Sequence, residues 1–490
     1  MLQSTRRKFL KETITCTAGI ALGPKLSATE LEIGQPFFNR WADIVIIGSG
    51  GAGLSAALAA HEAGCRDILI LEKMAITGGC TRISGGYYNA VDPERQEAQG
   101  ISDSIGNHVQ QTLLSGRGRN ARELVSKLCS EALPTLHWLE SLGVRYEQQC
   151  VQLYGGLFPR GHVPILPSGF ESYVDILIER CRERGIKIEC SRHVTQFIRD
   201  PETHKLGVVA RRKSLPPERI GARRAVIAAS GGYAANPRMF GKDDPRLASL
   251  DSTNPPSSTG EIMLAAAEFG AYTSGCDFIE CIPSPMRYSR FAIFVEKCIF
   301  VNQQGKRFAA EDERRDVLRD IVLGLPEKHG YCIVDNDGYS ACPDLFHKKA
   351  ENSIRRQEVF SAPSISELAR KLRIPTESLE RTIHDYNKAV ESGIDSEFGR
   401  HPQSMTAKIL KPPFWGALCK MSAHHTMGGL RINFNAEVLD WLGNPIANLF
   451  AAGEVTGGIH GASRLGGNAI TDIHVFGRIA GRNAALLKDG

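Results

Sequence analysis

The sequence predicts an α/β fold of more than one domain, and three observations lead to this prediction. Short apolar, β-branched runs end in glycines near positions 47, 229 and 452, as buried strands of a parallel sheet do. An alanine-rich helical segment follows the first of these runs directly. The chain has 490 residues, too many for one ordinary hydrophobic core.

Composition excludes some kinds of partner and site. Hydrophobic residues make up 42% of the chain and charged residues 23%, as in globular proteins. Although the net charge is +5, residues 1–28 carry +4 of it, so we expect no nucleic-acid partner for the nearly neutral remainder. The 13 cysteines contain no C-x-x-C pair, and we predict no metal site.

Residues 1–28 have the layout of an export signal. The basic stretch that contains Arg6 and Arg7 precedes a short apolar run over 14–23 and small residues near Ala28. Paired arginines favour twin-arginine export, which moves a folded protein to the periplasm. The alternative is a basic arm on a cytoplasmic protein.

The first expected elements form a dinucleotide site. A strand over 43–47 leads through Gly48, Gly50 and Gly53 into a helix over 54–63. These glycines allow a tight turn, close approach of a pyrophosphate and close packing of helix on strand, while the helix N-terminus attracts the phosphates. A second strand over 68–71 ends at Glu72, which is placed for ribose hydroxyls.

The next loop favours FAD over NAD. Residues 77–86 form a second stretch of small, glycine-rich residues directly after Glu72. Such a loop lets the backbone approach a ribityl chain and a flavin ring closely. The alternative is a plain surface turn.

Two later segments repeat the pattern of a strand that ends in glycine. One strand is expected over 225–229, before Ser230 and Gly231, and another over 448–452, before Gly453 and Glu454. A helix beginning near Asn468 would aim its N-terminus at the flavin. Its dipole would stabilise the negative charge of the reduced ring.

Several motifs make the chain resemble a known family. The most specific are His424-His425-Thr426-Met427-Gly428-Gly429, the Gly-Glu segment 453–458 and the segment 464–469, together with Gly305-Lys306-Arg307-Phe308. With these motifs the chain resembles the soluble flavocytochrome c fumarate reductases and their relative urocanate reductase. These proteins belong to the succinate dehydrogenase and fumarate reductase flavoprotein superfamily. The resemblance extends over about 42–487.

The resemblance implies a Rossmann-like FAD-binding domain of the GR2 type, interrupted by an α+β capping domain. The expected boundaries are a signal peptide over 1–28, FAD-binding pieces over 40–276 and 424–490, and a cap over 277–423. The active site would lie where the cap meets non-covalently bound FAD. The candidate cofactor-binding residues are Gly48, Gly50, Gly51, Ala52, Gly53, Glu72, Lys73, Gly79, Thr81, Ser84, Gly85, Gly86, Ser230, Gly231, His425, Gly453, Glu454, Leu465, Asn468 and Ala469.

The resemblance also implies reduction of a C=C bond conjugated to a carboxylate. A hydride would pass from flavin N5 to the β-carbon, and Arg315 would give a proton to the α-carbon. His424 and Arg464 would hold the carboxylate, and a guanidinium suits this task because it binds carboxylates in a fork. Glu296 is a candidate for the carboxylate that reprotonates Arg315.

Structural roles are the alternatives for these residues. Arg315 would otherwise belong to a surface charge cluster over 311–320, and the two histidines would form a core pair or a metal site. Adjacent residues on a strand point to opposite faces, so we expect His424 to face substrate and His425 the flavin environment.

The chain departs from the family in the cap. Fumarate reductases of this type have His-Pro-Thr where this chain has Ile282-Pro283-Ser284. Without that polar anchor we expect an aryl or heteroaryl acrylate as substrate rather than fumarate. Tyr288 would then stack on a ring of the substrate.

The absence of C-x-x-C-H predicts that electrons come from a separate donor, such as a c-type cytochrome or a membrane quinol dehydrogenase. Three other functions stay open on sequence alone. They are a fumarate reductase proper, a flavin dehydrogenase of the ketosteroid type, and a non-catalytic flavin sensor or electron-transfer protein.

Overall fold

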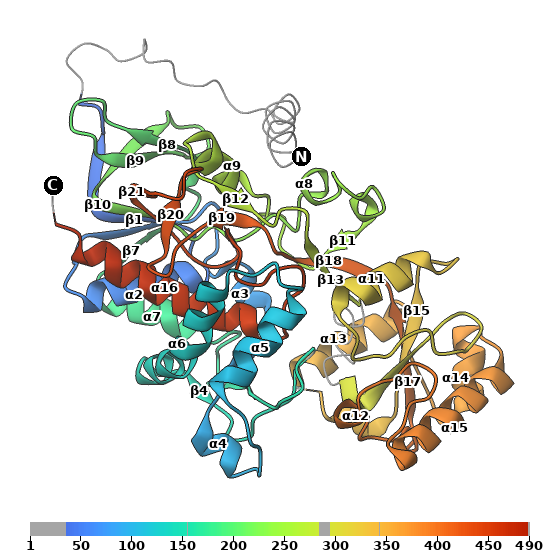
Figure 1. The fold of residues 1–490 in the computed structure, drawn as a ribbon. Coiled ribbons are helices and arrows are strands. Elements are labelled where there is room, and N and C mark those ends of the chain that lie inside the picture. Colours follow the sequence, from blue (N-terminus) through green and yellow to red (C-terminus); the bar gives the residue numbers. More distant parts are fainter. Residues whose placement is uncertain (1–35, 154, 284–294, 343, 489–490) are drawn as a thin grey trace.

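A computed structural model describes residues 36–153, 155–283, 295–342 and 344–488 of the chain (Figure 1). The expected export signal over 1–28, Ser284 and Tyr288 lie outside the described residues. No helix in the described part is long and apolar enough to cross a membrane.

A parallel sheet forms the centre of the larger body. Its strands follow the order β20-β21-β10-β1-β2-β7, in which only β20 is antiparallel to its neighbour. The hairpin β8-β9 extends the sheet from β10. Residues 44–47 of β1 are buried because the sheet is covered on both faces. The bounds of these strands are β1 (Arg40–Ile47), β2 (Ile68–Leu71), β7 (Lys187–Glu189), β8 (His193–Arg199), β9 (Leu206–Arg211), β10 (Glu218–Ala228), β20 (Glu437–Leu439) and β21 (Pro445–Ala451).

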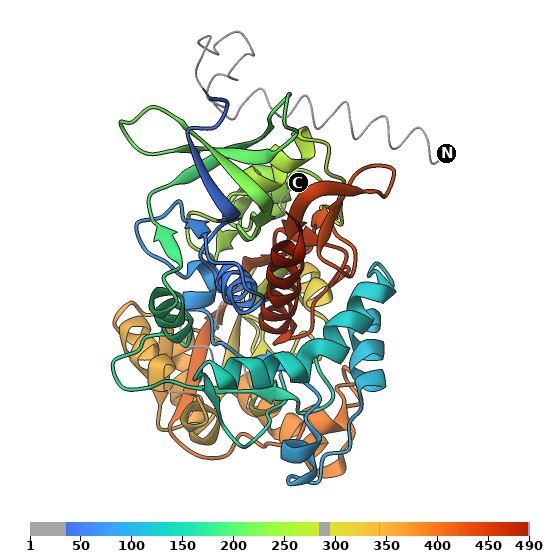
Figure 2. The same cartoon turned by 90° about the vertical axis from the view of Figure 1, so that its left-hand side faces the viewer.

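Two helices pack tightly together beneath this sheet, as Figure 2 shows for the blue α2 (Gly51–Glu62) and the dark red α16 (Asn468–Leu486). Gly477 and Gly481 of α16 lie directly against the backbone of α2. A Cβ atom added at Gly481 would lie 1.9 Å from the carbonyl oxygen of Ala56. The two helix backbones therefore touch without intervening side chains.

Further helices and short strands complete the larger body. The helices are α3 (Gly79–Ile83), α4 (Pro93–Glu97), α5 (Ile105–Ser115), α6 (Arg122–Ser141), α7 (Val174–Glu183), α8 (Pro237–Phe240) and α9 (Glu261–Glu268). The short strands are β3 (Tyr88–Asn89) with β5 (Gly161–His162), β4 (Arg145–Tyr146) with β6 (Pro164–Ile165), and β12 (Thr273–Ser274), β19 (Gly429–Arg431) and β22 (Thr456–Gly457) in one sheet.

A smaller body has its own antiparallel sheet and core (Figure 1). Apolar side chains from this sheet, α14 and α15 form a separate buried cluster, which includes Ile299, Leu368 and Tyr386. The sheet order is β14-β15-β17-β16. The elements are β14 (Cys298–Val301), β15 (Gly330–Val334), β16 (Val359–Ala362), β17 (Phe414–Cys419), α11 (Arg315–Gly324), α12 (Asn336–Ser340), α13 (Asp344–Arg355), α14 (Ile365–Leu372) and α15 (Thr376–Ser392).

A three-stranded sheet connects the two bodies. β18 (Met421–Thr426) lies between β11 (Asp251–Ser252) and β13 (Ile279–Pro283). β13 and β18 are the segments by which the chain enters and leaves the smaller body. Residues on them are therefore positioned against both bodies at once.

The predicted elements agree closely with the observed ones. The strand over 68–71 and the start of the last helix at Asn468 are observed as predicted, whereas α2 begins at Gly51, before the predicted residue 54. Gly51 and Gly53 are therefore part of the helix. Their lack of a side chain allows close packing against neighbouring residues. The predicted α/β fold class is confirmed.

Candidate active site

A continuous pocket lies where the carboxyl ends of β1, β2 and β10 meet β13, β18 and α11. Most of the residues predicted to bind cofactor or substrate line it. They are Gly48, Gly50, Gly51, Ala52, Glu72, Lys73, Gly79, Thr81, Ser84, Gly85, Gly86, Ser230, Gly231, Arg315, His424, His425, Glu454, Arg464 and Ala469. The pocket thus brings together segments that are up to about 400 residues apart in the sequence.

The glycines of the turn after β1 differ in whether the fold leaves room for a side chain. Gly48 has a φ of +105°, and a Cβ at Gly53 would lie 2.0 Å from the carbonyl oxygen of Gly48, so the fold itself requires both glycines. A Cβ at Gly50 would meet no atom closer than 3.8 Å. Gly50 has an extended backbone and no side-chain cap, so the space at this helix N-terminus stays open for a ligand.

Glu72 is held at the end of β2 by the glycine turn. One of its carboxylate oxygens accepts hydrogen bonds from the backbone N–H of Ser49 at 3.0 Å and from its hydroxyl at 2.7 Å. The other accepts from the N–H of Met74 at 2.8 Å. Beside it, Lys73 donates to Thr259 at 2.8 Å and pairs with Glu261 at 2.9 Å. These contacts fix the acid that was predicted to receive a ribose.

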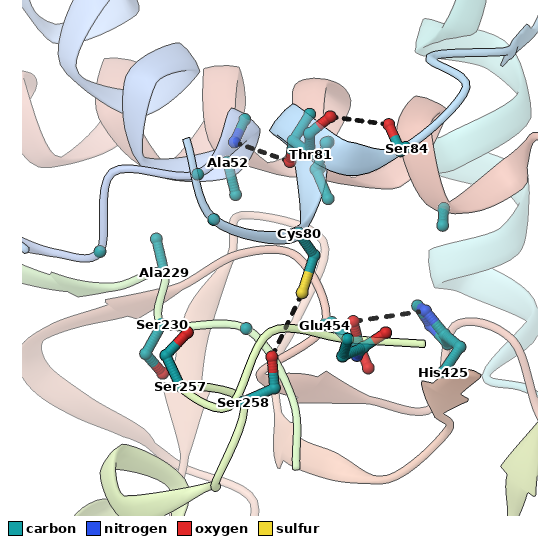
Figure 3. Close-up of a pocket in the computed structure, with 18 of the residues that line it drawn as sticks. Ala52, Cys80, Thr81, Ser84, Ala229, Ser230, Ser257, Ser258, His425 and Glu454 are labelled. Atoms are coloured by element: carbon teal, nitrogen blue, oxygen red, sulfur yellow. Dashed lines mark hydrogen bonds and ion pairs between the residues drawn. The ribbon is translucent and has the colours of Figure 1, made fainter. Parts of the chain in front are cut away.

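The second glycine-rich loop folds over the first. Gly51 donates its backbone N–H to the hydroxyl of Thr81 at 3.1 Å, which ties the loop to the start of α2 (Figure 3). Next to it, the Cys80 thiol lies 3.2 Å from the Ser258 hydroxyl. Burial raises the pKa of Cys80 to about 12, so this side chain is a neutral thiol.

The buried His425 and the largely buried Glu454 form a pair at the other side of the pocket (Figure 3). His425 Nδ1 lies 3.5 Å from Glu454, which also accepts hydrogen bonds from the backbone and hydroxyl of Thr426. Burial raises the pKa of Glu454 to about 7. Burial, followed by the charge of Arg464, holds the pKa of His425 well below its usual value, so the imidazole is neutral.

A β-bulge places His424 beside His425. Glu280 pairs with His425 and Cys281 pairs with Ala423, so His424 is an extra residue in β18 without a partner residue in β13. The argument that adjacent strand residues face opposite sides does not hold at a bulge, which re-aims a side chain. Both histidines therefore line the pocket. His424 Nδ1 is 2.7 Å from the Thr253 hydroxyl.

Arg315 and Arg464 approach one another from different bodies. Arg315 begins α11 and Arg464 lies in the loop before α16, and both are buried. Each guanidinium contacts the same oxygen of Glu280, and the Arg464 contact is 2.8 Å. The other Glu280 oxygen accepts the backbone N–H of Arg464 at 3.1 Å.

Charge keeps Glu280 ionised despite its burial. The side chain is fully enclosed, and burial alone would favour the neutral acid. The nearby cations Arg315 and Arg464 outweigh that effect and hold the pKa of Glu280 below its usual value. The site therefore contains a buried triad of two cations and one anion.

The structure places the remaining predicted residues away from the pocket wall. The side chain of Asn468 accepts from Asn89 and donates to Thr112, an internal network at the start of α16. Glu296 lies in the smaller body, where the charges of Lys297 and Arg400 favour its ionised form. Outside the lining residues are Gly53, Glu296, Gly453, Leu465 and Asn468. The relay role of Glu296 stays a prediction.

Glu280 is the residue that sequence reasoning missed. Ile282, which drew attention for its departure from the family, lines the pocket from β13. Glu280 precedes it by two positions, and residues i and i+2 of a strand share a face. The alternation of β13 could therefore have identified Glu280. Thr253, by contrast, is brought to His424 only through tertiary folding.

The residues present fit FAD. Two helices, α2 and α16, direct N-termini without side-chain caps toward one elongated pocket lined by glycine, alanine and serine. Among the described residues, the buried His425 Nε2 has no hydrogen-bond partner, as expected of a group that awaits a ligand. The phosphates of FAD would occupy the helix N-termini, and its flavin ring would offer a partner to His425.

Comparisons with known proteins agree with this geometry. A family described as "FAD binding domain" matches residues 43–470. A probable fumarate reductase of Shewanella frigidimarina is 34% identical over 453 residues, which cover 91% of this chain and 75% of that protein. The acrylate reductase flavoprotein subunit of Shewanella woodyi is 32% identical, and the match covers 97% of both chains.

A solved structure supports the same relationship. The open conformation of a flavocytochrome c3 fumarate reductase matches with a TM-score of 0.73 and 32% identity, over 92% of this chain and 79% of that chain. The resemblance seen in the sequence motifs is confirmed. The chain therefore belongs to the fumarate reductase family of flavoproteins and is an FAD-dependent oxidoreductase.

Proposed function

We propose that the protein reduces the C=C bond of an α,β-unsaturated monocarboxylate, and that its substrate is an aryl or heteroaryl acrylate rather than fumarate. The observation that carries this proposal is the composition of one pocket wall. Arg315, Arg464 and His424 line it together with the buried, apolar Ile282. A carboxylate and an apolar β-substituent match these two surfaces.

The residues of the pocket would divide the work. Arg464 holds the substrate carboxylate and stabilises the charge that develops as the double bond is reduced. His424, oriented by Thr253, contributes a second donor. Arg315 delivers the proton to the α-carbon. FAD, when bound, supplies the hydride.

The cofactor and the domain limits are part of the proposal. We infer non-covalent FAD, so acid precipitation should release the flavin into the supernatant. We keep the FAD-binding pieces at 40–276 and 424–490 and the cap at 277–423. The antiparallel sheet of the smaller body and α11 to α15 fall within that cap range.

We also propose twin-arginine export to the periplasm, with the acid serving as terminal electron acceptor. A separate c-type cytochrome or membrane quinol dehydrogenase would reduce the flavin. Replacement of Arg6 and Arg7 by lysine should trap the protein in the cytoplasm, as fractionation would show.

A screen of unsaturated acids tests the proposed reaction. The FAD-loaded protein is reduced with a dye, and reoxidation is followed after addition of fumarate, urocanate, cinnamate, a hydroxycinnamate, crotonate or itaconate. We expect one aryl or heteroaryl acrylate to reoxidise the flavin fastest. Faster reoxidation by fumarate would contradict the substrate class. If no acid exceeds buffer, the reductase proposal itself fails.

A further inference from the structure

We propose that Glu280 is a specificity-determining residue, an internal counter-charge that makes the site select monocarboxylates over dicarboxylates. The proposal rests on the proposed function and deepens it. The proposed function concerns the β-substituent of the substrate, whereas this inference concerns how many negative charges the substrate carries.

The contacts of Glu280 place it between two cations. One oxygen contacts Arg315 and lies 2.8 Å from Arg464, and the other accepts the Arg464 backbone N–H at 3.1 Å. Arg315 and Arg464 line the pocket, whereas Glu280 does not. Glu280 therefore lies behind the two guanidinium groups as seen from the pocket.

This arrangement fixes the charge that a ligand meets. Among the described residues of this wall, two arginines and one glutamate leave a net charge of about +1, which one carboxylate neutralises. Two other cations among the described lining residues are paired, because Arg192 contacts Glu218 and Lys73 contacts Glu261. A second carboxylate would add an unpaired negative charge to a site that already contains the buried Glu280.

The apolar wall acts in the same direction. Ile282 lies on β13 two residues from Glu280 and is 2% exposed. It offers no hydrogen bond to a second carboxylate, and a charge buried without a partner is costly. The charge of Glu280 and the apolar side chain of Ile282, both on β13, thus favour binding of a monoanion over a dianion.

Glu280→Gln isolates the charge. The amide oxygen can still accept from both arginines, while the wall gains one unit of positive charge. The backbone N–H of Arg464 loses its acceptor, so FAD content and Tm are measured alongside. Glu280→Asp keeps the charge and should keep the selectivity.

The test uses ligand pairs with one carbon skeleton. Succinate and monomethyl succinate are titrated into the oxidised, FAD-loaded protein, and Kd is measured by calorimetry or by the flavin absorbance change. For the wild type we expect monomethyl succinate to bind about tenfold more tightly. For Glu280→Gln we expect the Kd ratio to move by about tenfold toward succinate, because a dianion interacts with the added charge twice.

Glu311→Gln is the matched control. Glu311 is also fully buried and bridges two arginines, Arg307 and Arg400, but it is not among the residues that line the pocket. This variant should lower Tm without changing the Kd ratio. Loss of stability alone would therefore not imitate the effect of Glu280.

Two results would overturn the proposal. The first is equal binding of succinate and monomethyl succinate by the wild type, which needs no variant to fold. The second is an unchanged ratio in FAD-loaded Glu280→Gln. Failure of every unsaturated acid to reoxidise the flavin would instead count against the proposed reaction, because this binding test uses saturated acids and no turnover.

Discussion

Among single residues, Glu454 changes its charge near neutral pH. Burial raises its pKa to about 7 from an ordinary value of 4.5. Between these values the folded protein binds a proton that the unfolded chain has lost. The contribution of Glu454 to stability therefore falls as the pH rises from about 4.5 to about 7, by roughly 3 kcal/mol in total.

Glu454→Gln should remove this pH dependence. At pH 5 the variant and the wild type should have similar Tm values, because both carry a neutral side chain. Above pH 7 the variant should be the more stable protein, since it does not bury a charge. Calorimetry of both proteins from pH 5 to pH 8 measures the difference between their Tm values. A constant difference over that range would rule out the titration of Glu454.

Arg315→Ala should slow turnover strongly without loss of FAD. General acid catalysis contributes about 10²- to 10⁴-fold, so we expect kcat to fall within that range. The dye-linked assay measures the loss, and flavin absorbance measures cofactor content. Arg319→Ala is the control on the same helix, because Arg319 pairs with Asp320 and does not line the pocket. Full activity of Arg315→Ala would assign the proton to another group and favour a non-catalytic role.

Between elements, the contact of α2 with α16 sets the position of the cofactor site. Gly481→Ala would place a Cβ 1.9 Å from the carbonyl of Ala56, so the helices must separate. We expect a loss of about 1–3 kcal/mol in stability and weaker FAD binding, since the N-terminus of α2 moves with the helix. Urea unfolding and FAD titration measure the two effects.

Gly324→Ala is the control for this prediction. Gly324 ends α11, and its Cβ would meet no atom within 4 Å. Alanine there should be neutral or slightly stabilising, because it reduces the freedom of the unfolded chain. Equal stability and equal FAD affinity of the two variants would show that the contact between α2 and α16 determines neither property.

Strand β13 contributes Ile282 to the apolar wall of the pocket. Ile282→His would add a polar partner to the apolar wall, so turnover of fumarate should rise relative to that of an aryl acrylate by about tenfold. Ile282→Leu keeps the apolar character and should leave the ratio unchanged. The ratio of kcat/KM for the two acids is the measurement, and an unchanged ratio in Ile282→His would place the specificity elsewhere.

In the whole molecule, the cofactor pocket lies between two bodies, each of which has its own sheet. Residues from both line it, so bound FAD should stabilise them together. At a free FAD concentration 100 times Kd, the gain is about 2.7 kcal/mol. Thermal unfolding of the apoprotein over an FAD titration should show a rising Tm. A Tm independent of FAD would mean that the folded protein does not bind FAD in preference to the unfolded chain.

Sequence patterns predicted the parts of this molecule that depend on neighbouring residues. The glycines of the first turn, Glu72 and the start of α16 follow from local spacing and from the needs of a dinucleotide. The position of Glu280 and the presence of both His424 and His425 in the pocket depend on how β13 pairs with β18. No local pattern gives a bulge between strands that are more than 130 residues apart.

The bulge in β18 also has a consequence for how this site can diverge. Because His424 is an extra residue, loss of its single codon would restore regular pairing of Cys281 beside Glu280 and keep the strand intact. The sheet would survive while the histidine donor disappeared. A three-nucleotide deletion would therefore remove this donor together with the bulge, a change that no point substitution imitates.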